Sequence, residues 1–531
     1  MPLARQARYG VIGFDFSLSA PPDETGLGFV ESLDGMDQAG IVLYAAGAGL
    51  ESPWVIRRGW YQTHWSVSRT RALLLAAALR MMKDAVLECL AWHRQQPVPG
   101  VIMSGSGSCS GSGEGDLPPA EGLQGEALFR LIWPAGSQAQ HETGRKRVLP
   151  PELNGNRLVS VPLHQLLAYA GRTAGRIVRK AIDAGKGRSY LWQLGFLRAG
   201  SPTSLDFGGI HLANAQGKRF QADPCLVQGA DGQRVVFIEE WEPRLRRGHI
   251  SALAVEMPTD EAEPAPASAP AISGGLTEGH AAENRDAVPP AGTAPEGGVP
   301  AGRGAHDLPA VRLRHLGKVI TSQHHMSFPF HFRWQGDDFL CPEMSGSGRI
   351  TVWRAKHFPT DWTPIATLMK NVAAVDTMLF EAEGRWWMLT NLDRTGSTLV
   401  QASRDFHSEL HVFHAAHPLS QHWTPHPMNP VRIDSHGGRN AGILVSDNSI
   451  FRYGQIQAFD CYGHGIAVYR IVELSEHVYR EELVREIYPD TLSGLSGAHG
   501  LHTLSQAGDL AVIDLLHRGD LGHRPGSRTT R

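Results

Sequence analysis

One hairpin unit recurs five times from residue 222 onward, and this repeat constrains the fold more than any other feature. Residues 375–389, VDTMLFEAEGRWWML, show its form: an apolar strand, a turn bearing Gly, Asp or Asn, and a second apolar strand. The five copies occupy residues 222–241, 328–343, 375–389, 440–455 and 500–515. A further strand opened by glycine follows each of the first four copies.

Repeats that hold three or four strands in about 50–60 residues are typical of the blades of a β-propeller. A β-sandwich is the alternative, but it would not need the same starting motif five times. We therefore expect a mainly β fold, a five-bladed β-propeller over residues 205–516, followed by a flexible tail at 517–531. Residues 257–308 are rich in Pro, Ala, Gly and Glu, and we expect a disordered insert there.

The N-terminal part of the chain has a different texture. Two strand candidates, YGVIGFDF and GIVLYAA, precede a helix candidate near 66–96, and the first of them fits an opening Rossmann-type strand. We expect an α/β accessory module over 1–160, interrupted by a Gly/Ser linker at 104–120. A helical connector is expected over 161–204, with its helix at 162–185.

The basic residues of that helix could serve a contact with a membrane or a polyanion. They are Arg172, Arg176, Arg179 and Lys180. A solvated face is the favoured interpretation, and peripheral membrane contact stays open. The helix near 66–96 is interrupted by charged residues, so no transmembrane segment is expected.

Charge and cysteine content narrow the class of protein. A formal net charge of −3 leaves no excess of Lys and Arg to neutralise phosphates, which argues against nucleic acid as a partner. The 5 cysteines are dispersed and lack CxxC spacing, as is typical of reduced thiols. No signal-peptide pattern is found near Met1. We therefore expect a cytoplasmic protein.

The innermost strands of a propeller line its central channel, so the residues that open the repeated strands should converge there. Those that could carry chemistry are Asp223, Asp376, Arg439, Asn440 and His502. Acids also close the second strand of two hairpins, as the pair Glu239/Glu240 and as Glu343. The repeat therefore predicts one depression that holds carboxylates, an arginine and a histidine.

Several sequence motifs resemble known propeller families. ADP at 222–224 and VDTMLF…EGRWWML look like the blade openings of five-bladed glycoside hydrolases and transferases acting on furanosides and xylosides. More closely, FQADPCLV…FIEEW…GHIS, FPFHF…FLCPE, VDTMLFEAEGRWWM and WTPHPMNPV resemble the propeller domain found N-terminal in plant glucosamine inositolphosphorylceramide transferases and in bacterial relatives. The similarity covers residues 190–516. Bacterial relatives can also carry a formyltransferase-like region, which implies a degenerate module of that kind at 1–160.

In the hydrolases, a first aspartate is base or nucleophile, a later aspartate orients, and a glutamate is the acid. The resemblance puts Asp223 in the first position and Asp376 in the second. Where the hydrolases place the acid, this chain has Arg439 and Asn440, and Glu343 or Glu240 could substitute. Glycosyl transfer needs one ionised and one protonated carboxyl group, which clustered acids provide. An arginine there would suit an anionic substrate group.

The leading hypothesis is a carbohydrate-active enzyme of a bacterial polysaccharide or glycolipid pathway that transfers or hydrolyses a glycosyl group. The alternative is a catalytically silent glycan-binding or scaffolding propeller. The catalytic candidates are Asp223, Asp376 and Glu343. The substrate-binding candidates are Glu240, Arg439, Asn440, His502 and Trp387.

The expected partners are a saccharide or glycolipid, with a nucleotide-sugar donor as an option, and no cofactor or metal is expected. His407, His411, His414 and His417 are interpreted as a surface loop. Competing structural roles stay open for the site candidates. The aspartates could bond strand amides, His502 could line the channel, and Trp387 could pack in the core.

Overall fold

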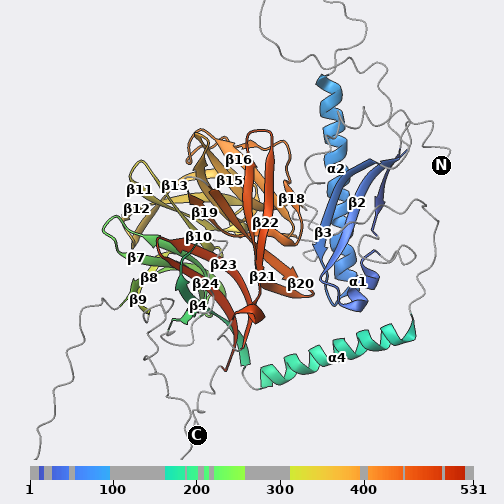
Figure 1. Ribbon diagram of the computed structural model, residues 1–531, viewed down its shortest axis with the longest axis horizontal. Helices are drawn as coiled ribbons and strands as arrows, with labels where there is room; N and C mark the ends of the chain where they lie inside the picture. The colour runs from blue at the N-terminus through green and yellow to red at the C-terminus, as the bar shows by residue number, and fades with distance from the viewer. Residues whose placement is uncertain are drawn as a thin grey trace, which may run out of the picture.

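The computed structural model describes eleven segments of the chain. They are residues 11–16, 27–46, 54–95, 162–185, 188–200, 209–213, 220–257, 311–394, 405–446, 449–492 and 497–520. The expected Gly/Ser linker at 104–120, nearly all of the insert at 257–308 and the last residues of the tail lie outside them. The described chain is mainly β, with five antiparallel sheets of four or five strands and one sheet of three strands (Figure 1).

The three-stranded sheet belongs to the N-terminal module. Its strands β1 (Val11–Asp15), β2 (Gln38–Ala46) and β3 (Trp54–Gln62) pair antiparallel in that order. The helices are α1 (Phe29–Asp34) and α2 (Val67–Gln95), and α2 buries Leu74, Ala77 and Met81 in a core shared with β2. The expected Rossmann-type strand is therefore wrong, because β1 is joined to an antiparallel meander and not to a parallel βαβ unit.

The five larger sheets contain the repeated hairpins. The first comprises β6 (Gln221–Gln228), β7 (Arg234–Glu242), β8 (Arg247–Glu256) and β9 (Arg312–Ile320). The second comprises β10 (Ser327–Trp334), β11 (Asp337–Glu343), β12 (Arg349–His357) and β13 (Asp361–Lys370). The third comprises β14 (Ala373–Ala382), β15 (Arg385–Asp393), β16 (Glu409–Ala415) and β17 (Thr424–Pro425), with β18 (Arg432–Ile433) also on β16.

The last two sheets complete the set. The fourth comprises β19 (His436–Ser446), β20 (Ser449–Ala458), β21 (Cys461–Leu474) and β22 (Tyr479–Ile487). The fifth comprises β23 (Ala498–Ala507), β24 (Leu510–Asp520), β4 (Arg188–Arg198) and β5 (His211–Leu212). Short 3-10 turns lie at Ser345–Ser347 and Pro489–Thr491.

The fifth sheet joins strands from two distant parts of the sequence. β24 pairs with β4 along the whole length of β4, from Arg188 to Arg198. These residues were expected in a helical connector, but alternating apolar residues such as Leu194 and Phe196 pack against Val236 and Val512 instead. Of the expected connector, the described helix is α4 (Leu163–Gly185). β24 likewise continues to Asp520, past the expected start of the tail.

The first strands of the five sheets contact one another in a closed order. β6 contacts β10, β10 contacts β14, β14 contacts β19, β19 contacts β23, and β23 contacts β6. Apolar side chains fill the space between neighbouring sheets, as where Phe332 and Phe339 pack on Trp386. The polar residues that open these strands are therefore brought to one region.

The N-terminal module is fastened to the third and fourth sheets (Figure 1). Ile433 of β18 lies in the core of the module, and the backbone N–H of Ser435 donates to the carbonyl of Trp60 at 2.9 Å. Arg80 of α2 donates to Glu409 at 3.0 Å. Among the described helices, none combines the length and the apolar character that a bilayer crossing requires.

Candidate functional site

A β-bulge opens the first strand of several sheets at the same point. Asp223, Phe328 and Asp376 have φ values of 51°, 42° and 48°, each within an interruption of strand register. β23 has such an interruption between Leu501 and Leu504. A left-handed residue in a bulge re-aims its side chain out of the regular alternation. The repeated bulge is therefore the local device that turns the strand-opening residues toward one another.

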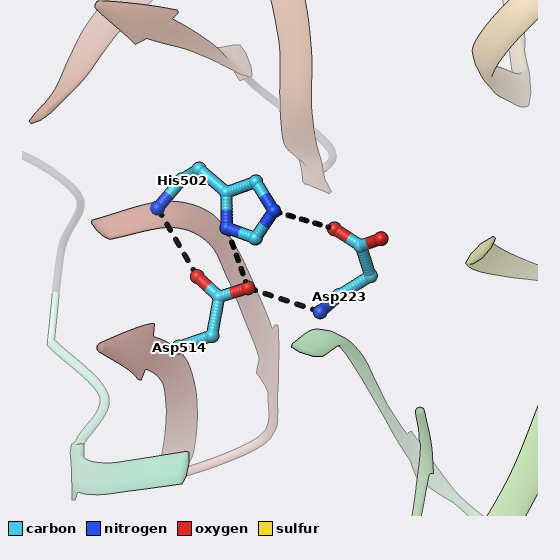
Figure 2. A group of neighbouring side chains, drawn as sticks. All are labelled: Asp223, His502 and Asp514. Atoms are coloured by element: carbon cyan, nitrogen blue, oxygen red, sulfur yellow. Dashed lines mark hydrogen bonds and ion pairs between the residues drawn. The ribbon is translucent and has the colours of Figure 1, made fainter. Parts of the chain in front are cut away.

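The first part of the site is a row of Asp223, His502 and Asp514 (Figure 2). The Nε2 atom of His502 lies 3.2 Å from Oδ1 of Asp223, and its Nδ1 atom lies 2.7 Å from Oδ2 of Asp514. Asp514 also accepts hydrogen bonds from the backbone N–H groups of Asp223, His502 and Thr503, at 3.0, 3.1 and 2.9 Å. Asp514 thus fixes two bulges and the imidazole together.

Charge in this row is set by burial and by the carboxylates. Burial disfavours the charged imidazole, but Asp514 and Asp223 outweigh it and raise the pKa of His502 above its ordinary value. Burial raises the pKa of Asp223, and the charge of His502 opposes this rise. Thr503 Oγ1 and the backbone N–H of Phe328 donate to the two oxygens of Asp223. The two carboxylates therefore favour the charged form of His502.

The second part of the site is built from Asp376, Glu343 and Arg439. The Nε of Arg439 donates to Oδ2 of Asp376, and its Nη2 lies 3.7 Å from Oε2 of Glu343. Gln455 Nε2 donates to Asp376 at 3.2 Å. Burial, together with a hydrogen bond and charge repulsion from Asp376, raises the pKa of Glu343 to about 8. Glu343 therefore keeps its proton at neutral pH, next to a carboxylate that is paired with an arginine.

Asn440 supports this part from the backbone side. Its Nδ2 donates to the carbonyl oxygens of Asp376 at 2.9 Å and Leu389 at 3.2 Å, and its backbone N–H donates to Asn391. The side chain is fully buried. The structure places Asn440 where it holds the Asp376 bulge rather than where a substrate would meet it.

Glu239 and Glu240 point in opposite directions from β7. Glu240 lies outside the site, since Ser251 Oγ donates to it at 2.7 Å and His315 Nε2 lies at 3.0 Å. Although burial raises the pKa of Glu240, these bonds and His249 hold it well below its usual range. Glu239 instead hydrogen-bonds Asp223, and burial and Asp223 raise its pKa well above the ordinary value. Successive strand residues face opposite sides, so Glu239, and not the predicted Glu240, lies next to Asp223.

Five buried acids thus form one group, called the acid cluster below. They are Asp223, Glu239, Glu343, Asp376 and Asp514. The two parts are electrically linked, because Asp376 raises the pKa of Asp223 and Glu343 raises that of Glu239. Asp514 was absent from the sequence candidates, although an acid inside the apolar run AVIDLL was a signal for it.

The aromatic residue expected to face a substrate is not the one at the site. Trp387 is fully buried in a core with Phe380 and Leu389, and its Nε1 donates to the carbonyl of Ala382. Tyr462 is 38% exposed, and its ring centroid lies 5.3 Å from Cζ of Arg439 and 5.2 Å from the His502 ring. Tyr462 therefore offers an aromatic face at the edge of the acid cluster.

The N-terminal module holds the loop that leads to Tyr462. Gln62 Nε2 donates to the carbonyls of Ala458 and Cys461, at 2.8 and 3.0 Å. The backbone N–H of Asp460 donates to the carbonyl of Thr63 at 3.1 Å. Residues from a distant part of the sequence thus fix the two ends and the middle of this loop.

Residues 301–501 match a family model. The family is described as glucosamine inositolphosphorylceramide transferase 1, N-terminal. The Arabidopsis thaliana transferase of that name is 30% identical over 224 residues, 39% of this chain and 28% of the relative. The Oryza sativa subsp. japonica transferase is 27% identical over 212 residues, 38% of this chain and 27% of the relative. The chain thus aligns with less than a third of either transferase, and the expected resemblance is confirmed.

Solved structures of glycoside hydrolases are also similar. Zg3597, a family 117 glycoside hydrolase from Zobellia galactanivorans, is 10% identical, with a TM-score of 0.33, over 61% of this chain and 90% of that one. A thermostable family-43 glycoside hydrolase is 10% identical, with a TM-score of 0.34, over 55% and 93%. Likeness at this level is too distant to indicate shared chemistry.

The matched range of the transferase family contains only some of the site residues. Glu343, Asp376 and Arg439 lie within residues 301–501, whereas Asp223, His502 and Asp514 lie outside it. The group that carries the protonated acid is therefore the part found within the family match.

Two further expectations concern metal binding. Among the described residues, the ligand atoms of Asp223, His502 and Asp514 lie within 4.8 Å of one another. The oxygens of Asp514 accept backbone hydrogen bonds, and each ring nitrogen of His502 lies within ion-pair distance of a carboxylate. The histidines at 407–417 were expected in a surface loop, but His411 and His414 are buried on the strand β16.

Proposed function

We propose that the five larger sheets are the blades of a five-bladed β-propeller whose acid cluster binds a glycosyl group and hydrolyses or transfers it. Two observations support the propeller: the closed order of contacts among the five first strands, and the bulge repeated at the same point of several of them. In this arrangement the acid cluster lies at one end of the central channel.

The burial of Glu343 beside Asp376 and Arg439, which raises its pKa to about 8, is the observation that carries the catalytic proposal. A glycosidic bond breaks when a protonated carboxyl group gives its proton to the leaving oxygen while a second carboxylate acts as base or nucleophile. Glu343 has a pKa of about 8 and fits the first role. Asp223, whose carboxylate adjoins the His502 imidazole and Thr503 Oγ1, fits the second. Arg439 pairs with Asp376, and Asp376 in turn raises the pKa of Glu343.

The proposed substrate is a saccharide or glycolipid, with a nucleotide sugar as the donor if the reaction is transfer. The partial match to transferases named for a glycosylated inositolphosphorylceramide supports this class. The exposed face of Tyr462 supports it too, because sugar rings pack their apolar faces on aromatic side chains.

A silent glycan-binding propeller is the second candidate. The burial of every acid in the cluster favours it. So does Arg439, which stands where the hydrolases are expected to have their catalytic glutamate and which pairs with Asp376 instead. In that case Tyr462 and the surrounding polar groups would bind a glycan without chemistry.

Glu343→Gln tests the proposal. Wild-type protein is incubated with aryl furanosides, aryl pyranosides and nucleotide sugars, and saccharide binding is followed by calorimetry. The variant should lose turnover by about 10²- to 10⁴-fold with binding retained, because the amide cannot donate a catalytic proton. Wild-type turnover should fall as pH rises through about 8, where Glu343 ionises.

The matched control is Glu381→Gln, an exposed acid on β14, which should leave turnover unchanged. Wild-type protein that binds saccharides but turns over none of these compounds would favour the silent propeller. Turnover that survives Glu343→Gln would remove Glu343 from the role of acid.

A further inference from the structure

The helix α4 (Leu163–Gly185) presents a continuous apolar face to solvent. Its exposed apolar residues lie on one side of the helix, as leucines in the first turns, the alanines Ala170 and Ala174 in the middle, and β-branched residues in the last turns. They include Leu163, Leu166, Leu167, Ile177, Val178 and Ile182. Leu163 is 70% exposed and Leu167 is 63% exposed, values expected for side chains that no part of the described chain covers. An isolated exposed leucine needs no explanation, but a stripe along 23 residues does.

The opposite face of α4 holds the helix on the molecule. Tyr169 donates from its hydroxyl to the carbonyl of Trp65 at 2.6 Å. Arg176 donates to Asp460 at 3.0 Å, and its guanidinium lies 4.7 Å from the centre of the Phe459 ring. In Figure 1, α4 runs along the edge of the molecule, apart from the sheets. The helix is therefore anchored by polar contacts, and its apolar stripe is left for something outside the described chain.

The charges on the side of the helix away from the stripe are all of one sign over most of its length. Arg172, Arg179 and Lys180 are exposed, and no Asp or Glu occurs from Leu163 to Ile182. The chain as a whole is slightly acidic, with a formal net charge of −3, so this basic helix is a local exception. By contrast, α2 also exposes leucines such as Leu79, but it carries Asp84 and Glu88.

We propose that α4 docks this protein on an anionic membrane surface. An amphipathic helix with a large apolar face, modest overall hydropathy and Lys or Arg on its polar face lies in the plane of a bilayer interface. The apolar stripe would enter the acyl boundary, and Arg172, Arg179 and Lys180 would meet anionic headgroups. Arg176 stays bound to Asp460, two residues from Tyr462, so docking would bring the edge of the acid cluster close to the bilayer.

Sedimentation with vesicles tests this docking, and it does not depend on any glycosyl chemistry. The full chain is mixed with vesicles of phosphatidylcholine containing phosphatidylserine, and with vesicles of phosphatidylcholine alone. It should bind the anionic vesicles at least tenfold more tightly, and 0.5 M salt should weaken the binding. The triple variant Arg172→Glu, Arg179→Glu, Lys180→Glu should bind about a hundredfold more weakly or worse.

The stripe is tested with Leu167→Glu and Ile177→Glu, and the matched control is Leu79→Glu on α2. The first two should abolish vesicle binding and the control should retain it, with circular dichroism unchanged in all three because each leucine or isoleucine is exposed. Wild-type protein that fails to bind anionic vesicles would overturn the proposal. So would binding that survives both α4 variants, or a wild-type dimer that these variants convert to a monomer.

Discussion

The two parts of the candidate site hold their charges in different ways. In one part His502 lies between Asp514 and Asp223, and three backbone N–H groups hold Asp514. In the other part Arg439 pairs with Asp376, next to the protonated Glu343. An imidazolium can lose its charge within the range of ordinary buffers, whereas a guanidinium cannot. The comparison teaches that one part has an adjustable cation and the other a permanent one.

Removing the permanent cation should have the larger effect. Arg439→Gln leaves Asp376 buried without its partner, which we expect to lower the free energy of unfolding by about 3–5 kcal/mol. The loss should be at least as large at pH 9 as at pH 6, because Glu343 also ionises as pH rises through about 8. Urea denaturation at both pH values measures it. Arg385→Gln, at a half-exposed surface pair, is the control and should cost less than about 1 kcal/mol. A small loss in Arg439→Gln would mean that the two cations are equivalent.

Removing the adjustable cation should have a smaller effect that depends on pH. The folded-state pKa of His502 is raised above 6.5, so the folded chain binds its proton more tightly than the unfolded chain does. This stabilisation is fully present below about pH 6.5 and is lost as pH rises through the folded pKa. His502→Gln should therefore cost about 2 kcal/mol at pH 5.5 and less at pH 9. Equal costs at the two pH values, measured by the same denaturation, would contradict an adjustable charge.

The smallest expected effect concerns the loop that leads to Tyr462, which lies over both parts. Gln62→Ala removes two hydrogen bonds to the carbonyls of Ala458 and Cys461 and should cost about 1–2 kcal/mol. Hydrogen exchange at residues 459–463 should speed up, while exchange near Asp514 stays unchanged. Faster exchange around Asp514 as well would show that the loop and the His502 row open as one unit.

The sequence predicted the repeated sheets well because their strands and turns are local features. Alternating apolar residues and glycine turns specify each hairpin without reference to the rest of the chain. The same pattern led to Asp223, Glu343, Asp376, Arg439 and His502, which open or close strands of the repeat. It could not distinguish Glu239 from Glu240, because bulges shift the strand register and the shift depends on hydrogen bonds between strands.

Long-range pairings account for most of the remaining differences. Nothing local in Arg188–Arg198 shows that it completes a sheet with β24, more than 300 residues later. An acid inside AVIDLL marks Asp514 as unusual, but its partners on β6 and β23 follow only from the contact between those strands. The antiparallel order of β1, β2 and β3 likewise follows from partners that the pattern of YGVIGFDF does not reveal.

The fifth sheet also decides when the acid cluster can exist during synthesis. Asp223 leaves the ribosome almost 300 residues before Asp514, and until then its carboxyl group has neither the imidazole nor the backbone N–H clamp that surrounds it in the finished protein. The strand β4 must wait, unpaired on one side, for β24 to arrive. The row of Asp223, His502 and Asp514 therefore forms only after β23 and β24 have docked, and a product terminated before Asp514 lacks it.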